Sequence, residues 1–261
     1  MKAYRKFIWQ SALSYLSEKT DMKLVLEHMK EPSKPTSFPE IFCRFLESLC
    51  NRRNMSQTIG NIKSLEPYFF GFDHIKMLEV YTDGETLYNK MHVQKTNQNN
   101  YSGLWKDFCI GSLDGARYLH RYSTYIDFLE FVNYFDKTAD TRAALACFIG
   151  QGIHGMKFAL ACDFLKEMGF PNYSKPDSHL KDILTSKGFD ISSESELEIF
   201  RTVALLADEV GETPYAVDRV FWLIGSGNLY RNHRTFKTDK EEFVRQTREI
   251  WAKENPPSRT R

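Results

Sequence analysis

Residues 141–183 read TRAALACFIGQGIHGMKFALACDFLKEMGFPNYSKPDSHLKDI. Apolar residues at helical spacing predict one helix that ends at residues 150–152 (GQG) and a second that opens at residues 155–157 (GMK). A short turn of Gly, Pro and Asn follows, and residues 175–179 (KPDSH) predict the start of a third helix. This stretch therefore predicts two helices joined by a tight glycine-rich turn, with a third helix close behind.

The helical period continues on both sides of this stretch. Phe42, Phe45, Leu46 and Leu49 recur at i, i+3, i+4 and i+7, and residues 128–135 form a second dense apolar segment. Strand-like alternation is scarce. The sequence predicts an all-α fold with roughly nine to twelve helices, given the usual lengths of helices and connections.

Composition and charge limit the domain organisation and the partners. The 261 residues include 35 Lys and Arg against 34 Asp and Glu, for a net charge of +1. This balance excludes a polybasic coat, so any nucleic-acid surface must be a local patch. The length predicts that residues 1–261 form a single unit of two helical lobes.

The cysteines and the apolar runs indicate the compartment. The five cysteines are odd in number, widely spaced and free of any C-x-x-C pair. They are typical of buried thiols in a reducing compartment rather than of disulfides or a zinc site. We see no signal peptide and no run of about 18 apolar residues, so the sequence predicts a soluble, cytoplasmic protein with no membrane partner.

The turn between the first two helices of residues 141–183 has a chemical use. A helix that opens after a tight turn presents free backbone N–H groups and the positive end of its dipole. Such a site binds a phosphate without needing Lys or Arg, which suits a protein of net charge +1. We therefore expect Gly152, His154 and Gly155 to contact an anionic partner.

Two motifs in this region resemble a known family. G-x-K at residues 155–157, followed about twenty residues later by P-D-x-H at residues 176–179, is similar to the helix-hairpin-helix (HhH-GPD) DNA glycosylases of base-excision repair. The resemblance implies that Lys157 stands at the nucleophile position of the bifunctional members and Asp177 at the carboxylate common to all members. The family hairpin usually reads G-x-G, where this chain has Ile153-His154-Gly155.

The resemblance extends to an earlier segment, and the positions of the cysteines argue against the iron–sulfur cofactor of some relatives. Residues 46–73 resemble the early helical segment whose polar residues reach into the DNA, which implies DNA contacts for Asn51, Arg52 and Arg53. Some relatives carry a four-iron cluster on a C-terminal loop of four cysteines. No Cys follows Cys162, so we expect no iron–sulfur cluster and no other cofactor.

The chemistry explains the choice of residue types. Breaking an N-glycosidic bond builds positive charge on the sugar, which a carboxylate such as Asp177 stabilises. A deprotonated amine such as Lys157 can attack the sugar and form a Schiff base that leads to strand cleavage (AP-lyase activity). Both its place in the first turn of a helix and burial would favour the neutral amine. The nucleotide must first be flipped out of the duplex into a pocket.

Each candidate residue also has an ordinary structural interpretation. Asp177 is typical of a helix N-cap, and Lys157 of a solvated helix lysine. His154 and His179 are typical of turns and caps, although His179 is also a candidate DNA contact. Asp218, in Val217-Asp218-Arg219, opens another apolar helix and is the competing carboxylate. The acid-free run of Arg231, His233, Arg234 and Lys237 either meets phosphates or forms a solvated face.

The sequence thus predicts a monomeric, all-α DNA glycosylase that removes a damaged or modified base from double-stranded DNA. It would act in base-excision repair or in defence against modified phage DNA, at the nucleoid of a prokaryote or in a nucleus. Two alternatives remain. One is a helix-hairpin-helix DNA-binding protein without catalysis, and the other is a helical interaction protein unrelated to DNA. Which base is excised stays open.

Overall fold

The computed structural model describes residues 1–52, 55–92, 102–229 and 234–256. About 71% of the chain is helical and 2% is strand, which confirms the all-α prediction. The described residues contain fourteen α-helices, so the expected number of roughly nine to twelve was too low. The excess comes from short helices, such as α4 (Met55–Ile59) with five residues, which carry too few apolar positions to show a period.

The chain divides into two compact units. Unit 1 combines Met1–Glu31 with Pro171–Arg261, and unit 2 is Pro32–Phe170. The first boundary falls in the proline-containing segment at residues 31–36, and the second falls inside the stretch 141–183. The two halves of the glycosylase-like motif therefore belong to different units.

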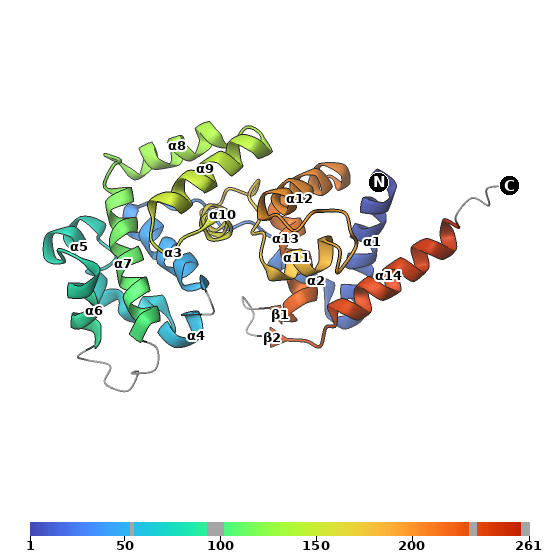
Figure 1. Cartoon of the computed structure of the whole chain (residues 1–261), viewed down its shortest axis with the longest axis horizontal. Helices are drawn as coiled ribbons and strands as arrows, with labels where there is room; N and C mark the ends of the chain where they lie inside the picture. The colour runs from blue at the N-terminus through green and yellow to red at the C-terminus, as the bar shows by residue number, and fades with distance from the viewer. Residues whose placement is uncertain (53–54, 93–101, 230–233, 257–261) are drawn as a thin grey trace. The chain divides into compact units, whose positions relative to one another are not determined.

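Unit 2 consists of helices (Figure 1), and aromatic side chains pack between them. Phe45 of α3 meets Phe164 of α10 edge to face, with ring centroids 5.5 Å apart and planes at 88°. A Cβ at Gly115 of α7 would lie 2.1 Å from the Phe45 ring, so glycine permits the close approach of α3 and α7. The helices are α3 (Phe38–Cys50), α4, η2 (Ile62–Phe69, a 3-10 helix), α5 (His74–Val80), α6 (Gly84–His92), α7 (Ser102–Leu119), α8 (Tyr125–Phe135), α9 (Ala139–Gly152) and α10 (Phe158–Glu167).

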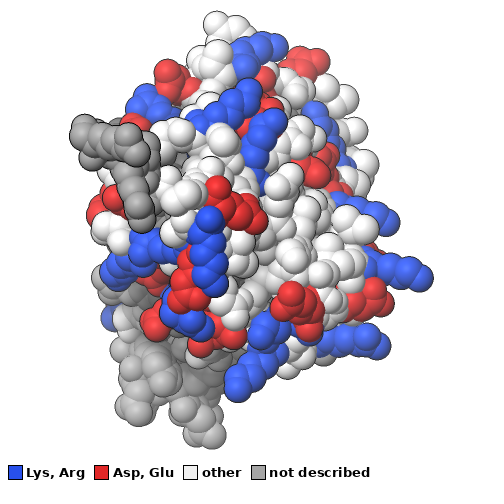
Figure 2. Space-filling view, turned by 90° about the vertical axis from the view of Figure 1, so that its right-hand side faces the viewer, with Lys and Arg blue, Asp and Glu red and all other residues white. Residues whose placement is uncertain are grey.

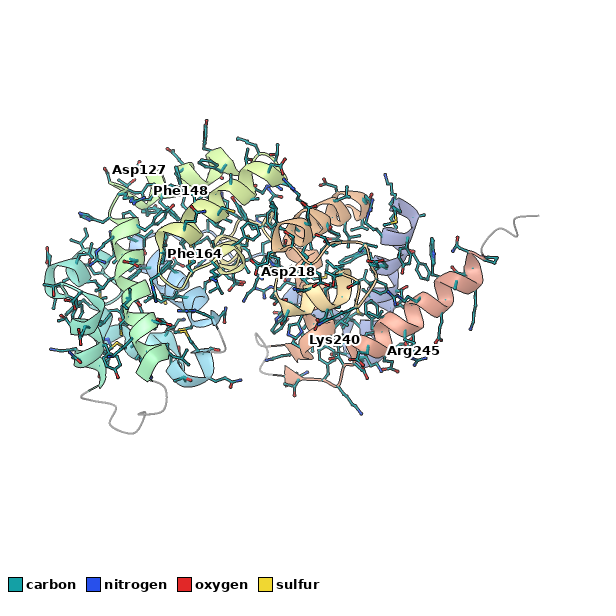
Figure 3. The ribbon with its side chains drawn as sticks, viewed as in Figure 1. Asp127, Phe148, Phe164, Asp218, Lys240 and Arg245 are labelled. Atoms are coloured by element: carbon teal, nitrogen blue, oxygen red, sulfur yellow. The ribbon has the colours of Figure 1, made fainter. Side chains whose placement is uncertain are left out.

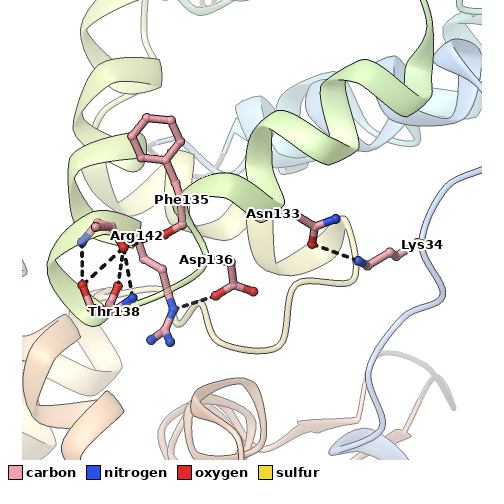
Figure 4. Close-up of polar contacts among 7 residues, drawn as sticks. Lys34, Asn133, Phe135, Asp136, Thr138 and Arg142 are labelled. Atoms are coloured by element: carbon pink, nitrogen blue, oxygen red, sulfur yellow. Dashed lines mark hydrogen bonds and ion pairs between the residues drawn. The ribbon is translucent and has the colours of Figure 1, made fainter.

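The turn between α8 and α9 is fixed by side-chain hydrogen bonds (Figure 4). Thr138 and Thr141 form a reciprocal capping box at the start of α9. The Thr141 hydroxyl also donates to the carbonyl oxygen of Phe135 at 2.7 Å. Arg142 Nε contacts Asp136 Oδ1 at 2.7 Å, with both side chains largely buried. These contacts set the direction in which α9 runs toward the glycine-rich turn.

Unit 1 unites the two ends of the chain around α13 (Figure 1). The core side of α13 carries Val217, Val220 and Phe221, all without exposed surface, and α1 contributes Ile8 and Leu16. Arg5 of α1 and Glu209 of α12 form an ion pair with two hydrogen bonds, of 2.6 and 2.7 Å. The elements are α1 (Lys2–Lys19), α2 (Met22–His28), α11 (Ser178–Leu184), α12 (Glu196–Val210), α13 (Pro214–Ser226), the antiparallel strands β1 (Asn228–Leu229) and β2 (Arg234–Thr235), and α14 (Lys240–Glu254).

None of the described helices combines the length and the apolar character needed to cross a bilayer.

Candidate functional site

Asp177 is the N-cap of α11 in unit 1. Its Oδ1 accepts hydrogen bonds from the backbone N–H groups of His179 at 2.9 Å and Leu180 at 3.2 Å. The third helix of the stretch 141–183 therefore starts where the sequence predicts. Asp177 also forms the N-cap hydrogen bonds of its structural interpretation. Asp177 as a whole residue is half-buried.

A second carboxylate, Asp218 of α13, lies in the interior of the same unit (Figure 3). It has no exposed surface, and its Oδ2 accepts from the backbone N–H of Lys175 at 2.6 Å. The N–H of Asp177 in turn donates to the carbonyl oxygen of Lys175 at 2.8 Å. The structure thus brings together the two carboxylates that the sequence offered as competitors.

The surroundings of Asp177 favour its protonated form. Burial and, second, the negative charge of Asp218 raise the pKa of Asp177 above its ordinary value. The Lys175 ammonium, the Leu180 N–H and His179 oppose this rise in pKa to a smaller extent. Asp177 therefore has a higher proton affinity than an exposed aspartate.

Aromatic rings border this corner of unit 1. The His179 ring meets Trp222 of α13 edge-on, with centroids 6.4 Å apart, and Trp222 stacks on His28 of α2 at 5.8 Å. The Nδ1 atom of His179 is buried and has no hydrogen-bond partner among the described residues. A Cβ at Gly225 would lie 2.3 Å from that atom, so glycine permits His179 to pack against α13.

Lys157 lies in unit 2, at the N-cap of α10. The helix begins at Phe158, one residue later than predicted, because Lys157 has the extended backbone conformation of a cap, with φ −115° and ψ −179°. Its side chain makes no capping hydrogen bond to the described residues and is exposed. The burial expected for a nucleophilic amine is therefore missing.

The turn that precedes α10 is held by two acidic side chains of α7. The N–H of His154 donates to Asp114 Oδ2 at 3.0 Å, and its Nε2 lies 2.8 Å from Asp107 Oδ1. The other oxygen of Asp107 accepts from Arg52 Nη1 at 2.8 Å. Gly155 has a φ of +81°, and a Cβ there would lie 2.8 Å from Arg52 Nη1. Arg52, His154 and Gly155 thus form one cluster, in which Asp107 and Asp114 already accept hydrogen bonds from Arg52 and His154.

Asn51 makes a structural hydrogen bond within unit 2. Its amide donates to Asp163 Oδ2 at 2.8 Å, and Asp163 forms an ion pair with Lys166 at 3.4 Å. The exposed fractions of these two charged side chains are only 5% and 3%. Because a buried charge needs hydrogen bonds as well as a counter-charge, Asn51 contributes to the stability of unit 2.

The remaining candidates are dispersed. Gly152 is the last residue of α9 and is exposed, and Arg234 lies exposed on β2. Arg53, Arg231 and His233 lie outside the described residues. On the face seen in Figure 2, the described Lys and Arg side chains are interspersed with Asp and Glu rather than gathered in a field of one sign.

Sequence reasoning missed Asp107 and Asp114. The two residues are seven positions apart in one helix, which places them two turns apart on the same face. That spacing was a visible signal, although it does not identify the turn that they contact.

Comparisons with known proteins found no match: no family model fits the chain, and no curated protein or solved structure is significantly similar to it. The described residues contain no group of three or more His, Cys, Asp or Glu side chains arranged to hold a metal ion.

Proposed function

We propose that this protein is a DNA glycosylase in which Asp177 is the catalytic carboxylate. The observation that carries the proposal is the state of Asp177: half-buried, fixed by two backbone N–H groups, and with its pKa raised by burial and by Asp218. A general base is most effective when its pKa approaches the working pH, so this environment improves an aspartate for the task. The likeness of residues 155–157 and 176–179 to the glycosylase motifs supplies the reaction.

The proposed reaction is hydrolysis. As the bond between the sugar carbon and the base nitrogen breaks, its electron pair leaves with the base and positive charge develops on the sugar. The Asp177 carboxylate stabilises that charge and takes a proton from the water that attacks the same carbon. The products are the free base, once protonated, and an abasic site in an intact strand.

Water is the attacking group in this proposal because Lys157 is exposed. A lysine that acts as a covalent nucleophile is activated by its enclosure in the site, which an exposed side chain lacks. AP-lyase activity through Lys157 is therefore the less favoured form of the same function.

The partner in this proposal is double-stranded DNA that carries a damaged or modified base. We place its phosphate contact at the turn of residues 153–157, which precedes the ten-residue helix α10. Arg52 and His154 lie beside this point, and both contact Asp107. A phosphate must therefore compete with Asp107 for them.

The experiment is to incubate the protein with damaged, methylated and phage DNA and to identify released bases by mass spectrometry. Alkali-cleavable abasic sites should appear with the wild type and be lost in Asp177→Asn. Asp208→Asn, at an exposed position of α12 in the same unit, is the matched control for the change in charge. Equal abasic-site formation by Asp177→Asn and the wild type would refute the role of Asp177.

The second candidate is a DNA-binding protein without catalysis. The observation in its favour is that Asp177 Oδ1 makes both hydrogen bonds of an ordinary N-cap. A gel shift on duplex DNA without release of any base would support this candidate. Absence of both binding and base release would point instead to a helical protein unrelated to DNA.

A further inference from the structure

The side chain of Asp218 is a fully buried carboxylate, and the energetic cost of burying it must be compensated by its contacts. A carboxylate without exposed surface is costly to bury unless strong hydrogen bonds compensate it. Its Oδ2 accepts a short bond of 2.6 Å from the N–H of Lys175, which lies 43 residues earlier in the sequence. The buried charge of α13 is therefore used to hold a turn in another part of unit 1.

The turn held in this way carries Asp177. The N–H of Lys175 donates to Asp218, and the carbonyl oxygen of Lys175 accepts from the N–H of Asp177 at 2.8 Å. Both backbone polar groups of Lys175 are thus fixed, one by α13 and one by Asp177 itself. Pro176 restricts the backbone between them. The direction of the Asp177 side chain depends on this chain of contacts.

The charge of Asp218 acts on Asp177 as well. The ionisable groups that face Asp177 are Asp218 from α13, Lys175 from the turn, and His179 from α11. Among them only Asp218 raises the pKa of Asp177, and its effect is second to that of burial.

We propose that Asp218 is the positioning residue of the Asp177 site: it fixes the turn of residues 175–177 and holds a negative charge beside the catalytic carboxylate. This inference rests on the proposed glycosylase function. It assigns Asp218 no contact with the DNA or the reacting atoms, so the two carboxylates are partners rather than alternatives.

The test separates charge from hydrogen bonding. Asp218→Asn removes the charge but keeps an oxygen that can accept from the Lys175 N–H, whereas Asp218→Ala removes both. We expect Asp218→Ala to lower single-turnover excision by about 100-fold, the loss typical of a misplaced catalytic group, and Asp218→Asn to lower it less. Equal losses in the two variants would overturn the hydrogen-bond part of the proposal.

A readout without DNA tests the charge. Carbon NMR of labelled aspartate, assigned through Asp177→Asn, follows the titration of the Asp177 carboxyl. The inflection should move to lower pH in Asp218→Asn and stay in place in Asp208→Asn. An unchanged inflection in folded Asp218→Asn would overturn the proposal. If Asp218→Asn and Asp218→Ala both fail to fold, hydrogen exchange of the wild type provides the test. The Lys175 amide must then be protected, and unprotected exchange would overturn the proposal.

The titration and the hydrogen exchange can be measured whether or not the protein is a glycosylase, so the failure of the inference and the failure of the proposed function can be told apart. A wild type that forms no abasic site, with an Asp177 titration that still responds to Asp218→Asn, refutes the glycosylase but supports the electrostatic effect of Asp218 on Asp177. Active wild type with an unresponsive Asp177 titration refutes the positioning role alone.

Discussion

The surroundings of carboxylates differ between the Asp177 site of unit 1 (residues 175–177 and Asp218) and the turn of residues 153–157 in unit 2. In unit 1 Asp177 lies near the fully buried Asp218, and burial first, then the negative charge of Asp218, raise the pKa of Asp177. In unit 2 the Asp107 carboxylate lies between the Arg52 guanidinium and the His154 ring at 2.8 Å from each. Two carboxylates lie near each other at Asp177, whereas a carboxylate and a guanidinium form an ion pair beside the turn. Shifted pKa values are typical of catalytic sites, so we propose catalysis for the Asp177 region and DNA binding for the turn.

The largest effect should come from the first region. We expect Asp177→Asn to lower single-turnover excision by roughly 100- to 1,000-fold, since the amide cannot stabilise the sugar cation or accept the proton of water. Asn is also a good N-cap, so the variant should fold and bind duplex DNA with unchanged affinity. Single-turnover kinetics and a binding isotherm provide the measurement. A parallel loss of rate and affinity would mean that Asp177 belongs to the binding surface.

The second prediction concerns the backbone of the turn. Gly155→Val places a β-branched residue at a φ of +81° and pushes the Arg52 guanidinium from its place. We expect a loss of about 1–2 kcal/mol in the free energy of unfolding, together with weaker DNA binding. Gly152→Ala is the matched control, since the added carbon would meet no described atom within 4 Å apart from its chain neighbours and the backbone of its own helix. Urea denaturation of both variants measures the difference, and similar small effects would contradict the strain argument.

The third prediction tests whether paired charge limits binding. Asp107→Asn frees Arg52 and His154 from a carboxylate, so an additional cation becomes available to phosphate. We expect the log–log salt dependence of duplex binding to steepen by about one unit, at about 0.9 for each neutralised phosphate. Asp208→Asn makes the same change in net charge away from the turn and should leave the slope in place. A slope that is the same in all three proteins would show that DNA does not contact this cluster.

Local signals predicted more of this molecule than distant ones. The end of α9 at Gly152 and the start of α11 after Asp177 follow from glycine and capping chemistry within a few residues. The contacts of His154 with Asp114 and Asp107 join residues 40 and 47 positions apart, and the contact of Asn51 with Asp163 spans 112. Such contacts depend on how helices pack, and periodicity does not report which helices meet.

The fourth prediction uses the pH dependence of stability. Because folding raises the pKa of Asp177, its protonated form stabilises the folded state at low pH, and this contribution is lost as the pH rises through the folded-state pKa. The wild type should therefore lose free energy of unfolding relative to Asp177→Asn as the pH increases from 3.8, the ordinary aspartate value, to above the raised pKa. Urea denaturation of both proteins at several pH values gives the difference. A constant difference, or one that changes in the opposite direction, would contradict the rise in pKa.

The smallest effect should come from Lys157, because its surroundings differ from those expected of a nucleophilic lysine. Its side chain is exposed at the N-cap of α10 and lacks the enclosure that activates a nucleophilic lysine. We expect Lys157→Gln to change single-turnover excision by about twofold or less, because water rather than the amine attacks the sugar. Borohydride should then trap no protein–DNA adduct from the wild type, although abasic sites form. A trapped adduct that disappears in Lys157→Gln would reverse this expectation: it would show that bound DNA supplies the desolvation that the free protein lacks, and that the spacing of twenty residues between Lys157 and Asp177 marks a bifunctional enzyme.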